Sequence, residues 1–260
     1  MPILKLASHS LHYQQDGPAD APALLLSNSL GTTLEMWRPQ LAALSRRYRV
    51  LRYDARGHGG SEAGPATPRL ADLAGDALSL LDALDIERAH FCGISMGGLT
   101  GLWLGVHAPE RLRSLTVGNS AAKIGETEAW RQRAAQVRAE GMAELAASAH
   151  LRWFSAGFCA QAPDTVEQAR AWLAATPPDG YAACCEALAD ADLRADLPRI
   201  AAPTLLIAGR QDPVTTAAQA EAMAAAMPDA RLALLPASHL SNLEAPFAFE
   251  QALLAFLDAH

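Results

Sequence analysis

The sequence predicts an α/β fold, with a mostly parallel sheet, helices on both faces and a helical cap. Short apolar runs of strand length alternate with segments whose apolar residues recur at helical spacing. Several runs are continuously apolar, as expected for strands buried on both faces. This alternation stops over residues 121–195, where no clear strand pattern occurs. We therefore expect a core of residues 1–120 and 196–260 and a helical cap of residues 121–195, inserted over the active edge of the sheet.

The predicted strands begin with a hairpin and continue as buried runs. Residues 3–15 alternate around His9 and Ser10, which predicts two short strands. Six further strands are predicted in chain order, at Ala21–Ser27, Arg49–Tyr53, Ala89–Cys92, Leu112–Val117, Thr204–Ala208 and Leu232–Leu235.

The predicted helices fall between these strands and throughout the cap. In the core we expect helices at Leu70–Leu84, Gly101–His107, 217–226 and Phe247–Leu257. Pro109 ends the second of these, because proline lacks the N–H that a continuing helix needs. In the cap we expect helices near Thr127–Arg138, Ala143–His150, Thr165–Ala174 and Tyr181–Ala189.

Composition excludes several classes of protein. Half of the 260 residues are hydrophobic and 19% are charged, so the chain can bury enough apolar surface to fold. The formal net charge of -7 argues against nucleic acid as a partner, because phosphate binding needs clustered Lys and Arg. No apolar run of about 18 residues predicts a membrane span. Nothing in the sequence sets an oligomeric state.

Cysteine usage and the N-terminus indicate the compartment. The four cysteines contain no C-x-x-C pair, and the adjacent Cys184 and Cys185 are poorly placed for a disulfide. Reduced thiols in a cytoplasmic protein fit best. The first residues lack the pattern of a signal peptide. We also expect no metal and no cofactor, because no ligand cluster or phosphate-cradling loop occurs.

A G-x-S-x-G motif supplies a candidate nucleophile. It reads Gly93-Ile94-Ser95-Met96-Gly97, with a predicted strand before it and a helix after it. That context is the strand-turn-helix in which a serine is exposed on a strained turn. The Met96 N–H would then lie at a helix N-terminus and point at a developing oxyanion.

A candidate acid and base follow two later strands. Asp212 comes after Thr204–Ala208, and His239 comes after Leu232–Leu235. Loops after parallel strands meet at one edge of a sheet, so both side chains are expected near Ser95. A serine needs a base, and the base needs an acid to orient it. His58 is the main competing base, but it precedes the nucleophile and we interpret it as loop structure.

The second oxyanion donor is expected in the loop after Ala21–Ser27. That loop reads Asn28-Ser29-Leu30-Gly31-Thr32, and the Leu30 N–H is the candidate by position. A simple turn at Gly31 is the alternative.

With these motifs, the sequence resembles the α/β-hydrolase superfamily over essentially the whole chain. The chain order Ser, Asp, His is the order expected there. Where many relatives have His-Gly, this chain has Asn28-Ser29, a form similar to that of the enol-lactonases. The segments that carry the resemblance are SNSLGTTLEMW (27–37), LRYDARGHGGSE (51–62), FCGISMGGLTGLWLG (91–105) and ASHLSNLEAP (237–246).

The resemblance to the enol-lactonases implies an activity and a small anionic lactone as substrate. It implies opening of 3-oxoadipate enol-lactone to 3-oxoadipate through an acyl-enzyme on Ser95. The substrate carboxylate needs a local cation, because the chain is net negative. Trp130 and Arg133, three residues apart, are candidates from one helix face; solvated arginines on an amphipathic helix are the alternative. A carboxylesterase, a carbon–carbon bond hydrolase, a cofactor-free perhydrolase and a non-catalytic receptor are the alternative functions.

Overall fold

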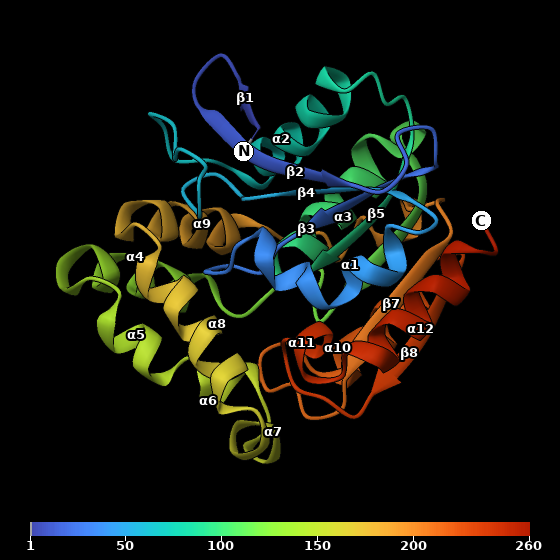
Figure 1. Ribbon diagram of the computed structural model, residues 1–260. Coiled ribbons are helices and arrows are strands. Elements are labelled where there is room, and N and C mark those ends of the chain that lie inside the picture. The colour runs from blue at the N-terminus through green and yellow to red at the C-terminus, as the bar shows by residue number, and fades with distance from the viewer. Residues whose placement is uncertain (1) are drawn as a thin grey trace.

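The computed structural model describes residues 2–260, and its centre is an eight-stranded sheet (Figure 1). Met1, with which the predicted core and N-terminal segment begin, lies outside the described residues. The strand order is β1-β2-β4-β3-β5-β6-β7-β8. The pairs β1–β2 and β2–β4 are antiparallel, and every pair from β4 to β8 is parallel. The strands are β1 (Ile3–Lys5), β2 (Ser10–Asp16), β3 (Ala23–Ser27), β4 (Arg49–Tyr53), β5 (Ala89–Ile94), β6 (Leu112–Gly118), β7 (Thr204–Gly209) and β8 (Ala230–Leu235).

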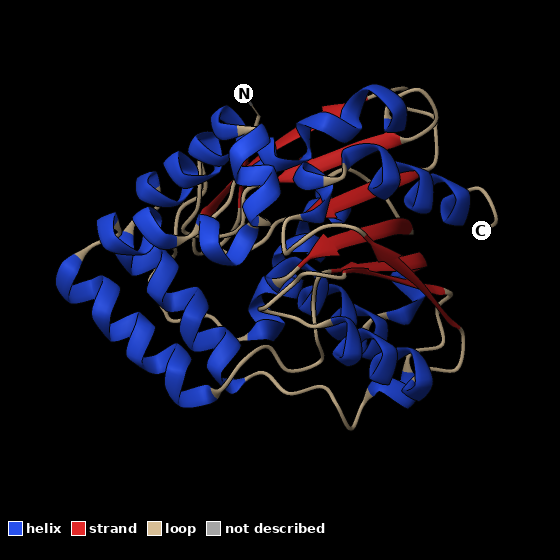
Figure 2. Cartoon of the chain, turned by 90° about the horizontal axis from the view of Figure 1, so that it is seen from below, coloured by secondary structure: helices blue, strands red, loops and turns tan. Residues whose placement is uncertain are grey.

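Helices cover both faces of this sheet (Figure 2). These helices bury β3, β5 and β7 along their whole length. Strand β8 lies at the edge of the sheet and is only partly buried. The predicted mostly parallel α/β fold is thus confirmed. The covering helices are α1 (Arg38–Leu44), α2 (Leu70–Ala83), α3 (Met96–His107), α10 (Ala217–Ala226) and α12 (Pro246–Leu257), with the short α11 (Ser241–Glu244) before the last.

Between β6 and β7 the chain forms a run of helices that gathers on one side of the molecule (Figure 1). Helix α4 packs against α9, and the three helices α5, α6 and α7 each contact α8. We call residues 121–195 the cap; its treatment as a unit apart from the core stays a prediction. Its helices are α4 (Thr127–Glu140), α5 (Ala143–Ser148), α6 (His150–Trp153), α7 (Ala156–Gln161), α8 (Pro163–Ala175) and α9 (Pro178–Asp190).

The structure differs from the predicted elements in several short helices. The sequence pattern gave no helix for the 3-10 turn η1 (Leu34–Trp37), α1, α7 or α11. In α1 the buried face includes Gln40, whose amide donates to the Asn242 carbonyl at 2.8 Å, so hydrophobic periodicity is lost there. The predicted helix Ala143–His150 is instead divided between α5 and α6. No helix in residues 2–260 is long and apolar enough to cross a bilayer.

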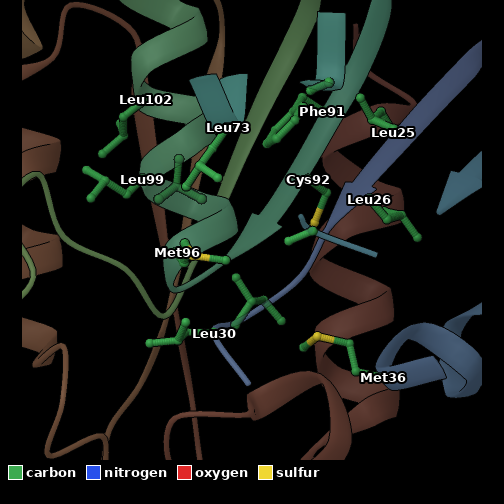
Figure 3. Close-up of a cluster of buried hydrophobic side chains, with 14 of the residues drawn as sticks. Leu25, Leu26, Leu30, Met36, Leu73, Phe91, Cys92, Met96, Leu99 and Leu102 are labelled. Atoms are coloured by element: carbon green, nitrogen blue, oxygen red, sulfur yellow. The ribbon is translucent and has the colours of Figure 1, made fainter. Parts of the chain in front are cut away.

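Buried hydrophobic side chains fill both faces of the sheet around β3 and β5, with helices α2 and α3 on one face (Figure 3). Phe91 of β5 packs toward Gly101 of α3, whereas Cys92 and its register partner Leu26 of β3, both fully buried, point to the opposite face of the sheet. The sheet and these helices therefore present the carboxyl ends of β3 and β5 on a rigid base.

Leu26→Ala is expected to lower the free energy of unfolding by about 2–5 kcal/mol, because it leaves a cavity in the centre of the sheet. The matched control is Leu151→Ala on α6, where the side chain is 71% exposed. There the change should stay within about 0.5 kcal/mol. Urea denaturation of both variants measures the difference, and equal losses would contradict this account of the core.

Candidate active site

Ser95 occupies a strained turn between β5 and α3. Its φ of 56° and ψ of -117° lie in a region that residues with a side chain rarely adopt. Two hydrogen bonds hold the turn: the Ser95 N–H donates to the Gly118 carbonyl at 2.9 Å, and the Ser120 hydroxyl donates to the Ser95 carbonyl at 2.7 Å. The surrounding strands thus fix the conformation that places Ser95 at the start of a helix.

Glycine is required on both sides of Ser95 because backbones pass very close together. A Cβ at Gly93 would lie 2.2 Å from the Gly97 carbonyl oxygen, and one at Gly97 would lie 2.3 Å from that of Ser27. Both neighbours are backbone atoms, which cannot move aside without displacing a strand or a helix turn. The glycines of the motif are therefore set by packing around the turn.

The structure brings Asp212 and His239 together. Asp212 follows β7, His239 follows β8, and Asp212 Oδ2 lies 2.8 Å from His239 Nδ1. An ionised carboxylate only accepts hydrogen bonds, so Nδ1 carries the proton and Nε2 of the neutral ring is left as a base. Ser95 and His239 line the same cavity. Their predicted catalytic roles stay predictions.

Neighbouring donors keep the Asp212 carboxylate ionised. Oδ2 accepts from the Asn119 amide at 3.0 Å and the Thr215 hydroxyl at 2.8 Å, and Oδ1 accepts from the Val214 and Thr215 N–H groups. Burial acts to raise the pKa of Asp212, but the positive charge of the protonated His239 ring, its hydrogen bond and these donors outweigh it and lower the pKa to about 2. Asp212 is thus an anion that can stabilise a positively charged His239.

Asn119 is a site residue that the sequence interpretation missed. It follows β6 with a φ of 41°, and besides Asp212 its amide donates to the Ser238 carbonyl at 3.0 Å. Its Oδ1 accepts from the Ser241 hydroxyl at 2.5 Å. Asn119 therefore joins the acid to the segment that carries His239. Its position after a parallel strand, the criterion that pointed to Asp212, was the available signal.

Two backbone N–H groups are available near Ser95. The oxyanion loop (residues 28–33) follows β3, and the Gly97 N–H donates to its Asn28 carbonyl at 3.0 Å. Within residues 2–260, the N–H groups of Leu30 and Met96 donate to no protein acceptor. Leu30 lines the cavity with Ser95, and Met96 is the first residue of α3, where the helix dipole favours negative charge. This geometry supports both predicted donors.

A cavity of about 220 Å³ lies between the core and the cap. The core contributes Ser95, His239 and Leu30, along with Val214 from the loop after β7. The side chains from the cap are larger and include three aromatic rings: Trp130, Arg133, Arg152, Trp153, Leu173 and Tyr181. The cap thus supplies most of the wall opposite the serine.

Two arginines of the cap line this cavity. The Arg133 guanidinium lies 4.9 Å above the Trp130 ring, so the predicted pair does share a helix face. Arg152 lines the same cavity, and burial together with the charge of Arg133 lowers its pKa. Among residues 2–260, neither arginine forms an ion pair with a carboxylate, although the exposed Glu126 also lines the cavity. Both guanidinium groups are thus available to an anion.

Other arginines of the cap are already neutralised. Arg131 pairs with Asp190 at 3.0 Å, and Arg138 pairs with Glu186. Ion pairing therefore distinguishes the cavity arginines Arg133 and Arg152 from the solvated Arg131 and Arg138 of α4. Within the described part of the chain, no group of three or more His, Cys, Asp or Glu side chains is placed to hold a metal ion.

Comparison with known proteins shows what this chain is similar to. The family described as alpha/beta hydrolase fold matches residues 22–246. The chain is 49% identical to 3-oxoadipate enol-lactonase 2 and 50% identical to 3-oxoadipate enol-lactonase 1 of Acinetobacter baylyi, each over 95% of this chain and 93% of the relative. The crystal structure of the enol-lactonase from Burkholderia xenovorans superposes with a TM-score of 0.97 at 45% identity, covering 99% of this chain and all of that one.

The pKa of Asp212 predicts a pH-dependent contribution to stability. Because its folded-state pKa of about 2 lies below the ordinary 3.8, the carboxylate stabilises the fold above pH 3.8 and this contribution is lost as the pH falls toward 2. Its size is about 2 kcal/mol. Asp212→Asn should therefore be less stable than the wild type near neutral pH, with a gap that narrows in acid. Urea denaturation across this range measures the gap, and a constant gap would contradict the assignment.

Proposed function

The chain belongs to the α/β-hydrolase family, and we propose that it opens 3-oxoadipate enol-lactone to 3-oxoadipate through an acyl-enzyme on Ser95. One observation carries the proposal: Ser95 and His239 line the same cavity as two arginines that, among residues 2–260, have no carboxylate partner. The names of the Acinetobacter relatives support the choice of lactone. The small cavity suits a compact substrate that bears one carboxylate.

Acylation begins with proton transfer from the Ser95 hydroxyl to His239 Nε2. The Ser95 oxygen attacks the lactone carbonyl carbon, and the resulting oxyanion accepts from the N–H groups of Leu30 and Met96. Collapse of this intermediate breaks the ring C–O bond and expels an enol oxygen, which takes the proton back from His239. Because an enol is a better leaving group than an alkoxide, this step asks little of His239 as an acid. The free enol then becomes the ketone.

Deacylation uses the same groups in reverse. Water loses a proton to His239, attacks the Ser95 ester and passes through a second oxyanion held by the same two N–H groups. Ser95 leaves with the proton from His239, and the second carboxylate of the product is released. Asp212 holds the ring through Nδ1 and stabilises its charged form in both half-reactions. These steps need no cofactor.

The substrate carboxylate binds between Arg133 and Arg152 in this proposal. The formal net charge of -7 repels an anion at long range, so recognition must be local. Guanidinium groups bind carboxylates through two parallel hydrogen bonds, and burial in a cavity strengthens them. The Trp130 ring packs against the Arg133 guanidinium, 4.9 Å from the ring centroid, and so holds it in the cavity wall.

The direct test follows the loss of lactone absorbance with purified enzyme. We expect rapid turnover by the wild type and a loss of at least about 10³-fold in kcat for Ser95→Ala, since the covalent route is removed. Labelling by a fluorophosphonate probe should likewise disappear in this variant. Labelling of Ser95 without lactone turnover would instead identify an esterase or another serine hydrolase of this fold, and no labelling would indicate a non-catalytic protein.

The role of Arg133 has a matched control on the same helix. Arg133→Ala should raise the KM for the lactone about 10- to 100-fold, because a charge-assisted hydrogen bond contributes about 1.5–3 kcal/mol. Arg131→Ala, which removes only an exposed pair with Asp190, should leave KM unchanged. Equal KM values for the two variants would place the carboxylate elsewhere.

A further inference from the structure

We propose that His58 is a positioning residue that sets the direction of the Leu30 N–H and links the oxyanion loop to helix α9 of the cap. His58 lies in the loop between β4 and α2 and is fully buried. It does not line the cavity and belongs to neither the acid nor the base of the site. The inference rests on the proposed Ser95 chemistry and adds a residue to it.

The hydrogen bonds of His58 fix its tautomer. The Gly31 N–H donates to His58 Nε2 at 3.0 Å, so Nε2 carries no proton. Nδ1 lies 3.1 Å from the Arg56 carbonyl oxygen, which can only accept, so the proton is on Nδ1. The ring therefore spans two backbone segments as a neutral bridge, and burial, which lowers the pKa of His58, favours this form.

The bridge ends on the peptide unit next to the oxyanion donor. The Ser29 carbonyl oxygen accepts from both the N–H and the hydroxyl of Thr32, at 3.2 and 2.8 Å. In a trans peptide the C=O and the N–H point in opposite directions. The bonds to the Ser29 carbonyl therefore also set the direction of the Leu30 N–H. The Gly31 N–H belongs to the following peptide unit, which His58 holds. Leu30 is thus fixed between two anchored peptide planes, one by Thr32 and one by His58.

The same loop is in close contact with the cap. A Cβ at Gly57 would lie 2.5 Å from Gly180 Cα, so the backbones of the His58 loop and α9 touch. The His58 ring lies 6.4 Å from the ring of Tyr181, which lines the cavity. These contacts give a path by which a shift of α9 would reach His58 and, through its hydrogen bond, Gly31. This path connects the wall that contacts substrate with the group that stabilises the oxyanion.

The fold of the His58 loop has other supports. Asp54 accepts from the N–H groups of Gly60 and Leu34 at 2.9 and 2.7 Å, and the Ser61 hydroxyl donates to the Asp54 carbonyl at 2.7 Å. None of these bonds involves the imidazole. We therefore expect variants of His58 to fold, with the change confined to the oxyanion loop.

The test compares His58→Leu with His58→Gln. Leucine fills space but leaves the Gly31 N–H without an acceptor, whereas the glutamine amide oxygen can replace Nε2. For His58→Leu we expect kcat for the lactone and the rate of Ser95 labelling by a fluorophosphonate to fall about 10- to 100-fold, because a misdirected oxyanion donor costs that much. KM should stay within about twofold, and His58→Gln should recover most of both rates.

His90→Leu is the matched control. His90 is also buried, but it bonds Ser114 between β5 and β6 and does not contact the oxyanion loop. Its kcat and labelling rate should equal those of the wild type. Equal rates for wild type and His58→Leu, or no recovery in His58→Gln when its melting temperature matches the wild type, would overturn the proposal.

Fluorophosphonate labelling tests the role of His58 independently of which substrate the enzyme opens. A wild-type enzyme that is labelled but does not open the lactone would refute only the substrate, because labelling of the His58 variants still tests the oxyanion loop. A wild-type enzyme that is not labelled at all would refute the Ser95 chemistry and, with it, the role of His58.

Discussion

The hydrogen bond from the Gly97 N–H to the Asn28 carbonyl joins the two halves of the candidate site. It draws the strained Ser95 turn and the oxyanion loop together, and it forms only because Gly97 has no Cβ to meet the Ser27 carbonyl. The two predicted oxyanion donors depend on this approach. The N–H groups of Met96 and Leu30 can donate to one oxyanion only if these two backbone segments are neighbours. The adjacent parallel strands β3 and β5 set that distance.

Charge in this protein is organised locally. The chain is acidic overall, yet the cavity wall carries two arginines that form no ion pair within residues 2–260, and the Asp212 carboxylate is held as an anion by its own set of donors. These two arrangements serve opposite needs. In the proposed reaction, Asp212 stabilises a cation that exists only during turnover, whereas Arg133 and Arg152 bind the anion of the substrate. Their separation on core and cap keeps Asp212 from neutralising the arginines.

The sequence was most informative where a residue's place is set by the end of a strand. Ser95, Asp212 and His239 were predicted because each follows an apolar run of strand length, and a parallel sheet brings the ends of such strands together. Arg133 could be selected with Trp130 because helical spacing puts them on one face. Arg152 could not be distinguished from other cap arginines, because its place in the cavity depends on how α6 packs. Helix α1 was not predicted, because the buried Gln40 interrupts its apolar face.

The measurement that tests the central claim most directly is acid quenching of the wild-type enzyme during lactone turnover, followed by mass spectrometry. Opening a ring leaves both parts of the substrate on the nucleophile, so the account predicts an adduct equal in mass to the whole lactone. That adduct should map to the peptide containing Ser95 and disappear when substrate is exhausted. Product formation without a covalent adduct at any quench time, or an adduct on another residue, would contradict the account.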